Sequence, residues 1–337
     1  MPASFRQLGP FTAANSATVL FQRWLRCWDF SPVSADSSPV TRRRRSMGKA
    51  YAYYPGCSLD STAKEYDMSV RAVFAKLDIE LHELDEWTCC GATHSAIYNA
   101  DSRFLLSLRN LALAEMQGYD TVVAPCSACY KNLRRAAKLA EADKTICTRV
   151  NDEMEEKFSC SGKVEVLHPL YLILRDYGLD TLKKRVVRPL TGFKIASYYG
   201  CMLTRPLDAF DSAERPTGLD RLVRALGAEP VDYDYKAKCC GGALALSHSD
   251  TTARMAGNIL ASAKARGAEA VTLACPMCHM ALDLYQSKAE KIVQHDLDLP
   301  VLFFTQLMGL ALGLEPAQLG LQRHIVPTAG MVARVGV

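Results

Sequence analysis

The sequence predicts an α/β protein made of two pseudo-symmetric repeats, each a small, mostly parallel sheet flanked by helices. Three observations predict this class: short apolar segments alternate with helical segments from residue 50 onward, a pattern of five cysteines occurs twice, and the two occurrences are related by a nearly constant offset. Alternating strands and helices are typical of a parallel sheet covered by helices. A constant offset between matching positions indicates an internal duplication.

Ten of the thirteen cysteines belong to the repeated pattern. In each copy a lone cysteine precedes a Cys-Cys-Gly sequence, which precedes a Cys-x-x-Cys pair. We call the first copy the first quintet; it comprises Cys57, Cys89, Cys90, Cys126 and Cys129. The second quintet comprises Cys201, Cys239, Cys240, Cys275 and Cys278. Equivalent cysteines lie 144 to 150 residues apart.

The apolar pattern predicts a similar order of elements in both repeats. In the first repeat, strands and helices alternate over residues 50–54, 61–76, 79–84, 95–116, 121–124 and a helix that begins after Cys126. A strand at 164–167 and a helix at 169–177 follow a polar stretch. In the second repeat the elements are 193–199, 218–226, 229–234, 251–266, 270–274, a helix after Cys275, and a closing strand and helix at 301–304 and 306–312.

These patterns divide the chain into five segments. We expect a basic, disordered extension or mis-assigned start at 1–46, a first cysteine-rich domain at 47–140, a connector at 141–192, a second cysteine-rich domain at 193–315 and a C-terminal tail at 316–337. The extension contains seven arginines and two aspartates, so it accounts for the net charge of +4. The remainder is close to neutral, which does not favour nucleic acid as a partner.

The composition is that of a protein without a membrane span of its own. No apolar run reaches the roughly 18 residues that a transmembrane helix requires, and no secretory signal with a clear apolar core opens the chain. Free thiols at metal-like spacings favour a reducing compartment, so we expect a cytoplasmic protein.

All three cysteine groups of each repeat directly follow a predicted strand. Because the carboxyl ends of parallel strands meet at one edge of a sheet, each quintet should form one pocket there. Adjacent cysteines suit a polynuclear metal centre, and the glycine after them lets the backbone approach its inorganic core. A structural zinc would use only four of the five thiols. Two further hypotheses are buried structural thiols and a redox dithiol at one Cys-x-x-Cys pair.

The histidines are weaker candidates for a catalytic role. His94 lies four residues after Cys90, and His279 directly follows Cys278. Either imidazole could bond a cluster sulfur or donate a proton to a leaving thiolate. Neither position is matched in the opposite repeat, so we expect most lone histidines, including His168 and His248, to be solvated or satisfied in the core.

The two quintets resemble the duplicated cysteine-rich CCG motif of the B subunit of heterodisulfide reductase and its homologues, over about residues 49–314. The resemblance implies two non-cubane [4Fe-4S] clusters, one per repeat, each held by the five cysteines of one quintet. It also implies a substrate disulfide between the clusters and electrons delivered by a partner iron–sulfur protein. The chain has no ferredoxin-like cysteine run and no dinucleotide-binding glycine motif of its own.

On this basis the favoured function is that of the iron–sulfur catalytic subunit of a heterodisulfide reductase-like complex, an oxidoreductase acting on sulfur compounds. Its expected partners are an iron–sulfur electron-donor subunit, similar to the C component of that complex, and a flavin-containing subunit, similar to its A component. The substrate would be a small disulfide, a persulfide or carrier-bound sulfur. The alternative is an electron-transfer or membrane-anchoring cysteine-rich subunit of a succinate dehydrogenase-, lactate- or glycolate-oxidising complex, attached peripherally to a membrane through its partners.

Overall fold

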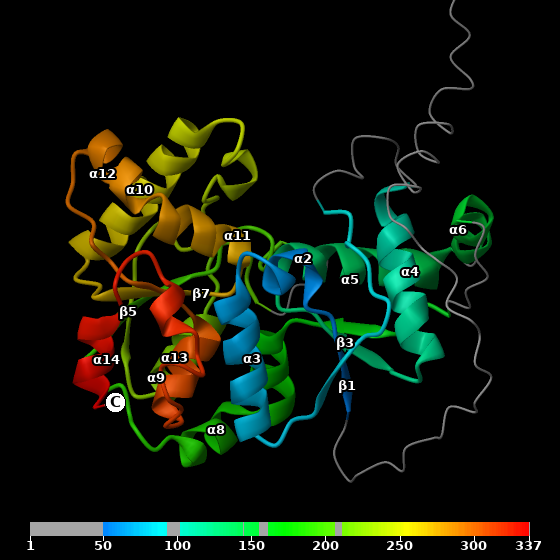
Figure 1. Cartoon of the computed structure of the whole chain (residues 1–337), viewed down its shortest axis with the longest axis horizontal. Helices are drawn as coiled ribbons and strands as arrows, with labels where there is room; N and C mark the ends of the chain where they lie inside the picture. Colours follow the sequence, from blue (N-terminus) through cyan, green and yellow to red (C-terminus); the bar gives the residue numbers. More distant parts are fainter. Residues whose placement is uncertain (1–49, 93–101, 144, 155–160, 206–210, 337) are drawn as a thin grey trace, which may run out of the picture. The chain divides into compact units, whose positions relative to one another are not determined.

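Two four-stranded parallel sheets form the framework of the protein, and helices pack on both of them (Figure 1). The predicted fold class is therefore confirmed. The computed structural model describes residues 50–92, 102–143, 145–154, 161–205 and 211–336. The segment 1–46 lies outside these residues, and residues 47–337 form one unit.

The first sheet has the strand order β2-β1-β3-β4. Its strands are β1 (Tyr51–Tyr53), β2 (Leu81–Glu83), β3 (Thr121–Val123) and β4 (Glu165–Leu167). Tyr53 pairs with Glu83 on one side and with Val123 on the other, and every neighbouring pair is parallel. The helices of this half are α2 (Gly56–Asp60), α3 (Lys64–Lys76), α4 (Ser102–Met116), α5 (Ser127–Ala142) and α6 (Ile146–Met154).

The second sheet repeats the same arrangement, in the order β6-β5-β7-β8. Its strands are β5 (Lys194–Tyr198), β6 (Glu229–Val231), β7 (Ala270–Leu273) and β8 (Val301–Phe303). Its helices are α9 (Gly218–Ala225), η3 (Gly242–Leu244), α10 (Ser249–Ala265), α11 (Pro276–His279), η4 (Met280–Leu284), α12 (Gln286–Val293) and α13 (Phe304–Ala311). The strands β1, β3 and β7 are fully buried, as expected for short apolar runs covered on both faces.

Several helices form where the sequence pattern does not predict them. The polar connector contains α6 as well as α8 (Leu179–Arg185), and the predicted helix 169–177 divides into α7 (Pro169–Leu172) and a π-helical turn, η2 (Ile173–Tyr177). The last segment forms η5 (Leu321–Arg323) and α14 (Ala329–Val335). Strand β4, which we placed in the connector, is the fourth strand of the first sheet, in the position that β8 holds in the second.

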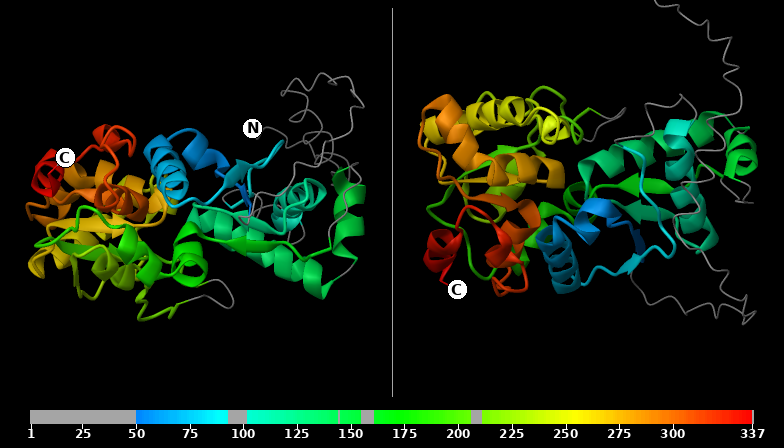
Figure 2. Two further views of the ribbon diagram at one scale, coloured as in Figure 1. Left: turned by 90° about the horizontal axis from the view of Figure 1, so that it is seen from below. Right: turned by 45° about the horizontal axis from the view of Figure 1, so that its top comes forward.

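The two repeats are joined by buried contacts between α3 and α13, which lie side by side in Figures 1 and 2. Ser69 on α3 and Thr305 on α13 share a hydrogen bond of 2.7 Å. The Tyr66 ring stacks on Phe303 with the ring centroids 4.0 Å apart and the planes 4° from parallel. Both hydroxyl-bearing side chains and both rings are fully buried. The repeats therefore share one core, because separating them would expose these buried apolar faces to water.

The C-terminal segment closes this core over α13. Leu319 is fully buried and lies against Gly309, where a Cβ would overlap the Leu319 side chain. Gly309 is therefore required for close packing, since the helix itself would favour alanine at that position.

We predict that Gly309→Ala destabilises the protein by about 1–3 kcal/mol, because a methyl group must displace a buried leucine. Gly330→Ala is the matched control: Gly330 lies in helix α14, and a Cβ there meets no atom within 4 Å. That substitution should be neutral or stabilise by up to about 1 kcal/mol through helix propensity alone. Urea unfolding of both variants checks the prediction, and equal stability of the two would contradict it.

Candidate functional site

The cysteines of each quintet follow the carboxyl ends of the strands of one sheet, as the sequence predicts. In the first repeat, Cys57 follows β1, the Cys-Cys pair follows β2, and Cys126 is the residue immediately before helix α5. In the second repeat the same positions follow β5, β6 and β7, and Cys275 is the residue immediately before α11. Each Cys-x-x-Cys pair thus begins where a helix begins, with unpaired N–H groups near the first thiol.

The thiols of the first quintet form a connected chain. The Cys57 thiol lies near that of Cys89, and the Cys89 thiol near that of its neighbour Cys90, so each shifts the pKa of the next. The Sγ atoms of Cys90 and Cys129 are 3.2 Å apart, and the Cys129 thiol lies near that of Cys126. Cys57 and Cys89 are exposed, while the other three are buried. The chain therefore runs from the surface into the core.

The second quintet has the same arrangement. The Sγ atoms of Cys240 and Cys278 are 3.4 Å apart, and the Cys278 thiol lies near that of Cys275. The Cys201 thiol lies near that of Cys239 at the outer end, where Cys239 is exposed. Neighbouring thiols of each quintet thus lie close together.

The two quintets meet in the interior of the protein. Cys126 and Cys275, the first cysteines of the two Cys-x-x-Cys pairs, lie close enough across the boundary between the repeats that each thiol shifts the pKa of the other. Both are buried. We call this contact the junction. Sequence spacing predicts each pocket separately but contains no information about the distance between them.

Hydrogen bonds to backbone carbonyls fix the junction. The Ser127 hydroxyl donates to the Ala274 carbonyl at 2.9 Å, which links the residue after Cys126 to the residue before Cys275. His168, which directly follows β4, lies with Nε2 2.7 Å from the Pro125 carbonyl and 3.1 Å from that of Ala274. Its Nδ1 accepts the Leu170 N–H at 3.1 Å, so the proton must be on Nε2. The imidazole therefore holds the residues before both junction cysteines.

We expect lone histidines such as His168 to be either solvated or hydrogen-bonded in the core, and the hydrogen bonds of His168 place it in the second group. Burial lowers its pKa from 6.5 to about 4, since no water can solvate the imidazolium there. The ring is neutral at physiological pH.

Glycines let the backbone approach the thiols. Gly56 and Gly200, which precede the first cysteine of each quintet, have φ angles of +71° and +66°. A Cβ on Gly56 would lie 3.0 Å from the Cys129 sulfur, and one on Gly200 would lie 3.2 Å from that of Cys278. A side chain at either position would both strain the backbone and crowd a thiol.

Two tyrosines hold the Cys-Cys-Gly loops in equivalent ways. The Tyr54 hydroxyl donates to the Thr88 carbonyl at 2.6 Å, and the Tyr198 hydroxyl donates to the Lys238 carbonyl at 2.7 Å. Each acceptor directly precedes a Cys-Cys pair. Sequence reasoning alone does not reveal this positioning role of the two tyrosines. Both lie three residues before the lone cysteine of their quintet, and that repeated position was the available signal.

Crowding of the thiols changes their acidity. The hydrogen bond from Cys129 lowers the pKa of Cys90, and the hydrogen bond from Cys278 likewise lowers the pKa of Cys240. The second cysteine of the Cys-Cys pair thus favours the thiolate in both repeats. Thiolates so close together repel unless a cation lies between them. Five soft sulfur donors around one point suit iron–sulfur or zinc chemistry, and neighbouring thiolates can bind neighbouring irons.

His279 lies in a second cluster of polar side chains, next to the quintet. Its Nε2 is 3.1 Å from Nδ1 of His324, and its ring stacks on Phe303 at 4.5 Å. Asp283 completes a group whose ligand atoms lie within 4.8 Å of one another. These groups already have hydrogen-bond partners within the protein, since the Asp283 carboxylate accepts hydrogen bonds from the N–H groups of Ile325 and Val326. Burial lowers the pKa of His279 to about 3, so its ring is neutral.

Of the two catalytic histidine candidates, His94 lies outside the described residues. The proposed role of His279 stays a prediction. Cys147 lies outside both quintets and is disulfide-bonded in the structure.

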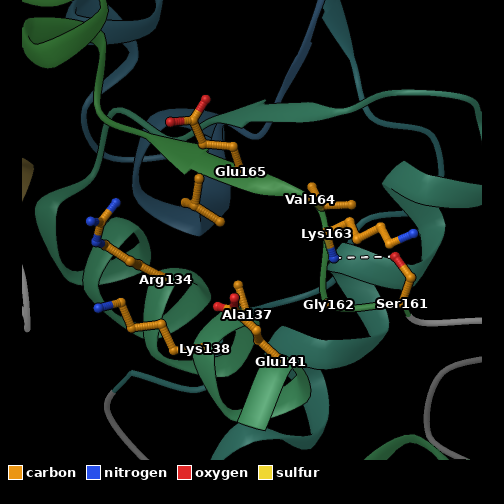
Figure 3. A pocket seen from close by; sticks show the side chains of 10 residues that line it. Arg134, Ala137, Lys138, Glu141, Ser161, Gly162, Lys163, Val164 and Glu165 are labelled. Atoms are coloured by element: carbon orange, nitrogen blue, oxygen red, sulfur yellow. Dashed lines mark hydrogen bonds between the residues drawn. The ribbon is translucent and has the colours of Figure 1, made fainter. Parts of the chain in front are cut away.

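A groove of about 450 Å³ lies between α5 and the segment that leads into β4. Figure 3 shows Arg134, Lys138 and Glu141 on one side and Lys163 and Glu165 on the other. No cysteine of either quintet lines it. The groove is therefore separate from the sulfur site.

The described helices include none that is long and apolar enough to span a bilayer.

Comparison with known proteins identifies both repeats. The cysteine-rich domain family CCG matches residues 51–134 and 195–283. The chain is 34% identical to the 8-methylmenaquinol:fumarate reductase membrane anchor subunit of Wolinella succinogenes, over 83% of this chain and 98% of that protein. It is 29% identical to the B subunit of the ferredoxin/F(420)H(2)-dependent CoB-CoM heterodisulfide reductase of Methanosarcina acetivorans, over 84% of this chain and 95% of that protein.

Fold comparison agrees with this result. A structure of a hypothetical protein from Helicobacter pylori matches 83% of this chain with a TM-score of 0.67 and 16% identity, and this chain spans about half of that longer protein, 52%. The chain therefore belongs to the family of proteins with two cysteine-rich CCG domains, which includes the B subunits of heterodisulfide reductases. The two relatives named above are each a subunit of a reductase complex.

The neutral state of His168 predicts a pH-dependent stability. Its pKa is lower in the folded protein than the 6.5 of the unfolded chain, so unfolding takes up a proton as the pH falls. The contribution of the neutral His168 ring to the free energy of unfolding is fully present above pH 6.5. It declines by about 1.4 kcal/mol per pH unit down to about pH 4. Urea unfolding between about pH 7.5 and 4.5 should show a shallower decline for His168→Gln. His248→Gln, which changes an exposed ring, should keep the wild-type slope; equal slopes in all three proteins would contradict the assignment.

Proposed function

We propose that this protein is the sulfur-handling iron–sulfur subunit of a heterodisulfide reductase-type complex, with one non-cubane [4Fe-4S] cluster on each quintet. The observation that carries the proposal is the pair of connected quintets, each with exposed thiols at one end and both meeting at the junction. A bound cluster would supply one-electron chemistry at iron and an accessible position for a soft sulfur ligand. Two such centres together match a reaction that needs two electrons.

The reaction class follows from these sites. A disulfide that gains two electrons and two protons gives two thiols, and each nascent sulfur needs a centre to receive it. The protein's own part is to hold the two quintets at a fixed separation, through His168 and Ser127, and to keep the inner thiols away from water. Electrons would come from a partner iron–sulfur subunit, with a flavin-containing subunit further upstream.

A second candidate function is favoured by the relative of higher identity. At 34% identity over nearly its whole length, the Wolinella succinogenes anchor subunit supports a role in transferring electrons or attaching a fumarate reductase- or succinate dehydrogenase-type complex to a membrane. The same two clusters would then pass electrons without breaking a substrate disulfide. The fold and the quintets are compatible with either role.

The first experiment is to purify the protein anaerobically with its native complex. Two four-iron clusters require about eight irons and eight acid-labile sulfides per chain, in addition to those of the partner iron–sulfur subunit. A heterodisulfide reductase-type flavin subunit in the complex and thiol formation from added disulfides would support the first function. A fumarate reductase-type flavoprotein without disulfide cleavage would support the second, and stoichiometric zinc without iron would exclude both.

Substitution of single cysteines tests the ligand assignment. Cys90→Ser and Cys240→Ser each remove the thiol with lowered pKa from one quintet, so each should lose the cluster signal of its own half and about half of the iron, since each quintet serves one centre. Electron paramagnetic resonance and iron analysis are applied to both variants, so that each variant serves as the control for the quintet that the other one alters. An unchanged spectrum in either variant would remove that cysteine from the ligand set.

Substitution of glycines tests whether the backbone must approach the centre closely. Gly56→Ala places a Cβ against the Cys129 sulfur, whereas Gly118→Ala meets no atom within 4 Å. Both residues have positive φ, +71° and +83°, so both variants incur backbone strain of about 1–2 kcal/mol. Only Gly56→Ala should lose iron from the first quintet. If both variants keep full iron content, the close approach is not required for binding.

A further inference from the structure

Tyr66 is a buried tyrosine whose hydroxyl has no hydrogen-bond partner. Its side chain is fully buried, and the hydroxyl is one of a few buried polar atoms of the described residues without a partner. Other buried tyrosines near the sites are satisfied: Tyr54 and Tyr198 donate to carbonyls, and Tyr53 donates to Asp67 at 2.8 Å. A phenol left unpaired in a protein interior is destabilising, so its retention calls for a partner.

The surroundings of Tyr66 fix where its hydroxyl can act. The ring lies between repeats, stacked on Phe303 and edge-on to Phe304 with the centroids 6.3 Å apart. It therefore cannot turn away without breaking buried aromatic contacts. The ring lies next to the junction, because Phe303, on which it stacks, pairs with Leu273, two residues before Cys275. The Phe304 ring in turn lies 6.1 Å from that of His168, which binds the carbonyls just before both junction cysteines. A neutral phenol at this place is a hydrogen-bond donor.

We propose that Tyr66 is a positioning residue whose hydroxyl donates a hydrogen bond to a sulfur anion held at the junction of the two quintets. The inference rests on the proposed function and deepens it, because it assigns a donor to the space between the two centres. The acceptor is a cluster or ligand sulfur, or the sulfur of a substrate thiolate. In either case the donor stabilises negative charge on sulfur, which favours the reduced or thiolate-bound state.

The pattern of contacts separates this role from simple packing. The aromatic ring alone satisfies the contact with Phe303 and Phe304, and phenylalanine would do so without an unpaired hydroxyl. Repeat packing through Ser69 and Thr305 does not involve the phenol oxygen. What the hydroxyl adds is a single donor in an otherwise apolar position next to the junction.

The test is Tyr66→Phe in the anaerobically purified complex, which keeps the ring and removes only the donor. We expect unchanged iron content, unchanged or higher resistance to urea, and a midpoint potential of the clusters that is shifted to a more negative value. If the acceptor is a substrate sulfur, the potential without thiol should be unchanged, and the concentration of 2-mercaptoethanol needed to alter the paramagnetic signal should rise by several fold. Either shift supports the proposal.

Tyr53→Phe is the matched control, since Tyr53 is equally buried in the same repeat but donates to Asp67. It should lower stability, because the carboxylate loses a donor, and leave both the potential and the thiol response as in the wild type. If Tyr66→Phe with full iron content leaves the potential and the thiol response unchanged, the proposal is wrong while the proposed function stands. If wild-type protein contains no iron, the proposed function and this inference both fail.

Discussion

The contact between Cys126 and Cys275 is the constraint on which the arrangement of the site depends. Two thiols that lie close together in the core require the backbones that carry them to be held in fixed positions relative to each other. His168 and Ser127 provide this by binding the carbonyls of Pro125 and Ala274, just before the two cysteines. Because these carbonyls belong to different repeats, the duplication holds both quintets in one fixed arrangement instead of forming two independent domains.

The interior around the junction is apolar and closely packed. Phe303, Phe304 and Tyr66 cover it from the side of α3 and α13, and burial of these rings contributes to stability in proportion to the apolar area removed from water. The same packing excludes water from the inner thiols. In such an environment, charge on sulfur depends strongly on nearby donors and cations. Hydrogen bonding within each quintet and binding of a metal are therefore two different ways to satisfy the same atoms.

The repeats are alike around the thiols and differ elsewhere. Gly56 and Gly200 adopt the same backbone conformation, and Tyr54 and Tyr198 donate to the carbonyl just before the Cys-Cys pair. By contrast, the helix after Cys126 continues unbroken for 16 residues, whereas the one after Cys275 passes into a π-helical turn after four. This asymmetry gives the two quintets different surroundings, as expected if they play different parts in one reaction or transfer path.

The sequence by itself determined the fold class, the duplication and the membership of both quintets, because apolar periodicity and cysteine spacing are local properties of the chain. It could not predict α6 and α8, whose polar residues form helices only as they dock on the rest of the protein. Tertiary structure alone decided that the quintets touch through Cys126 and Cys275, that His168 binds across the repeats, and that the Tyr66 hydroxyl lies near them. The reason is physical: the contacts between the repeats join residues about 100 or more positions apart, and their distances follow from how the two sheets pack, which no short-range pattern records.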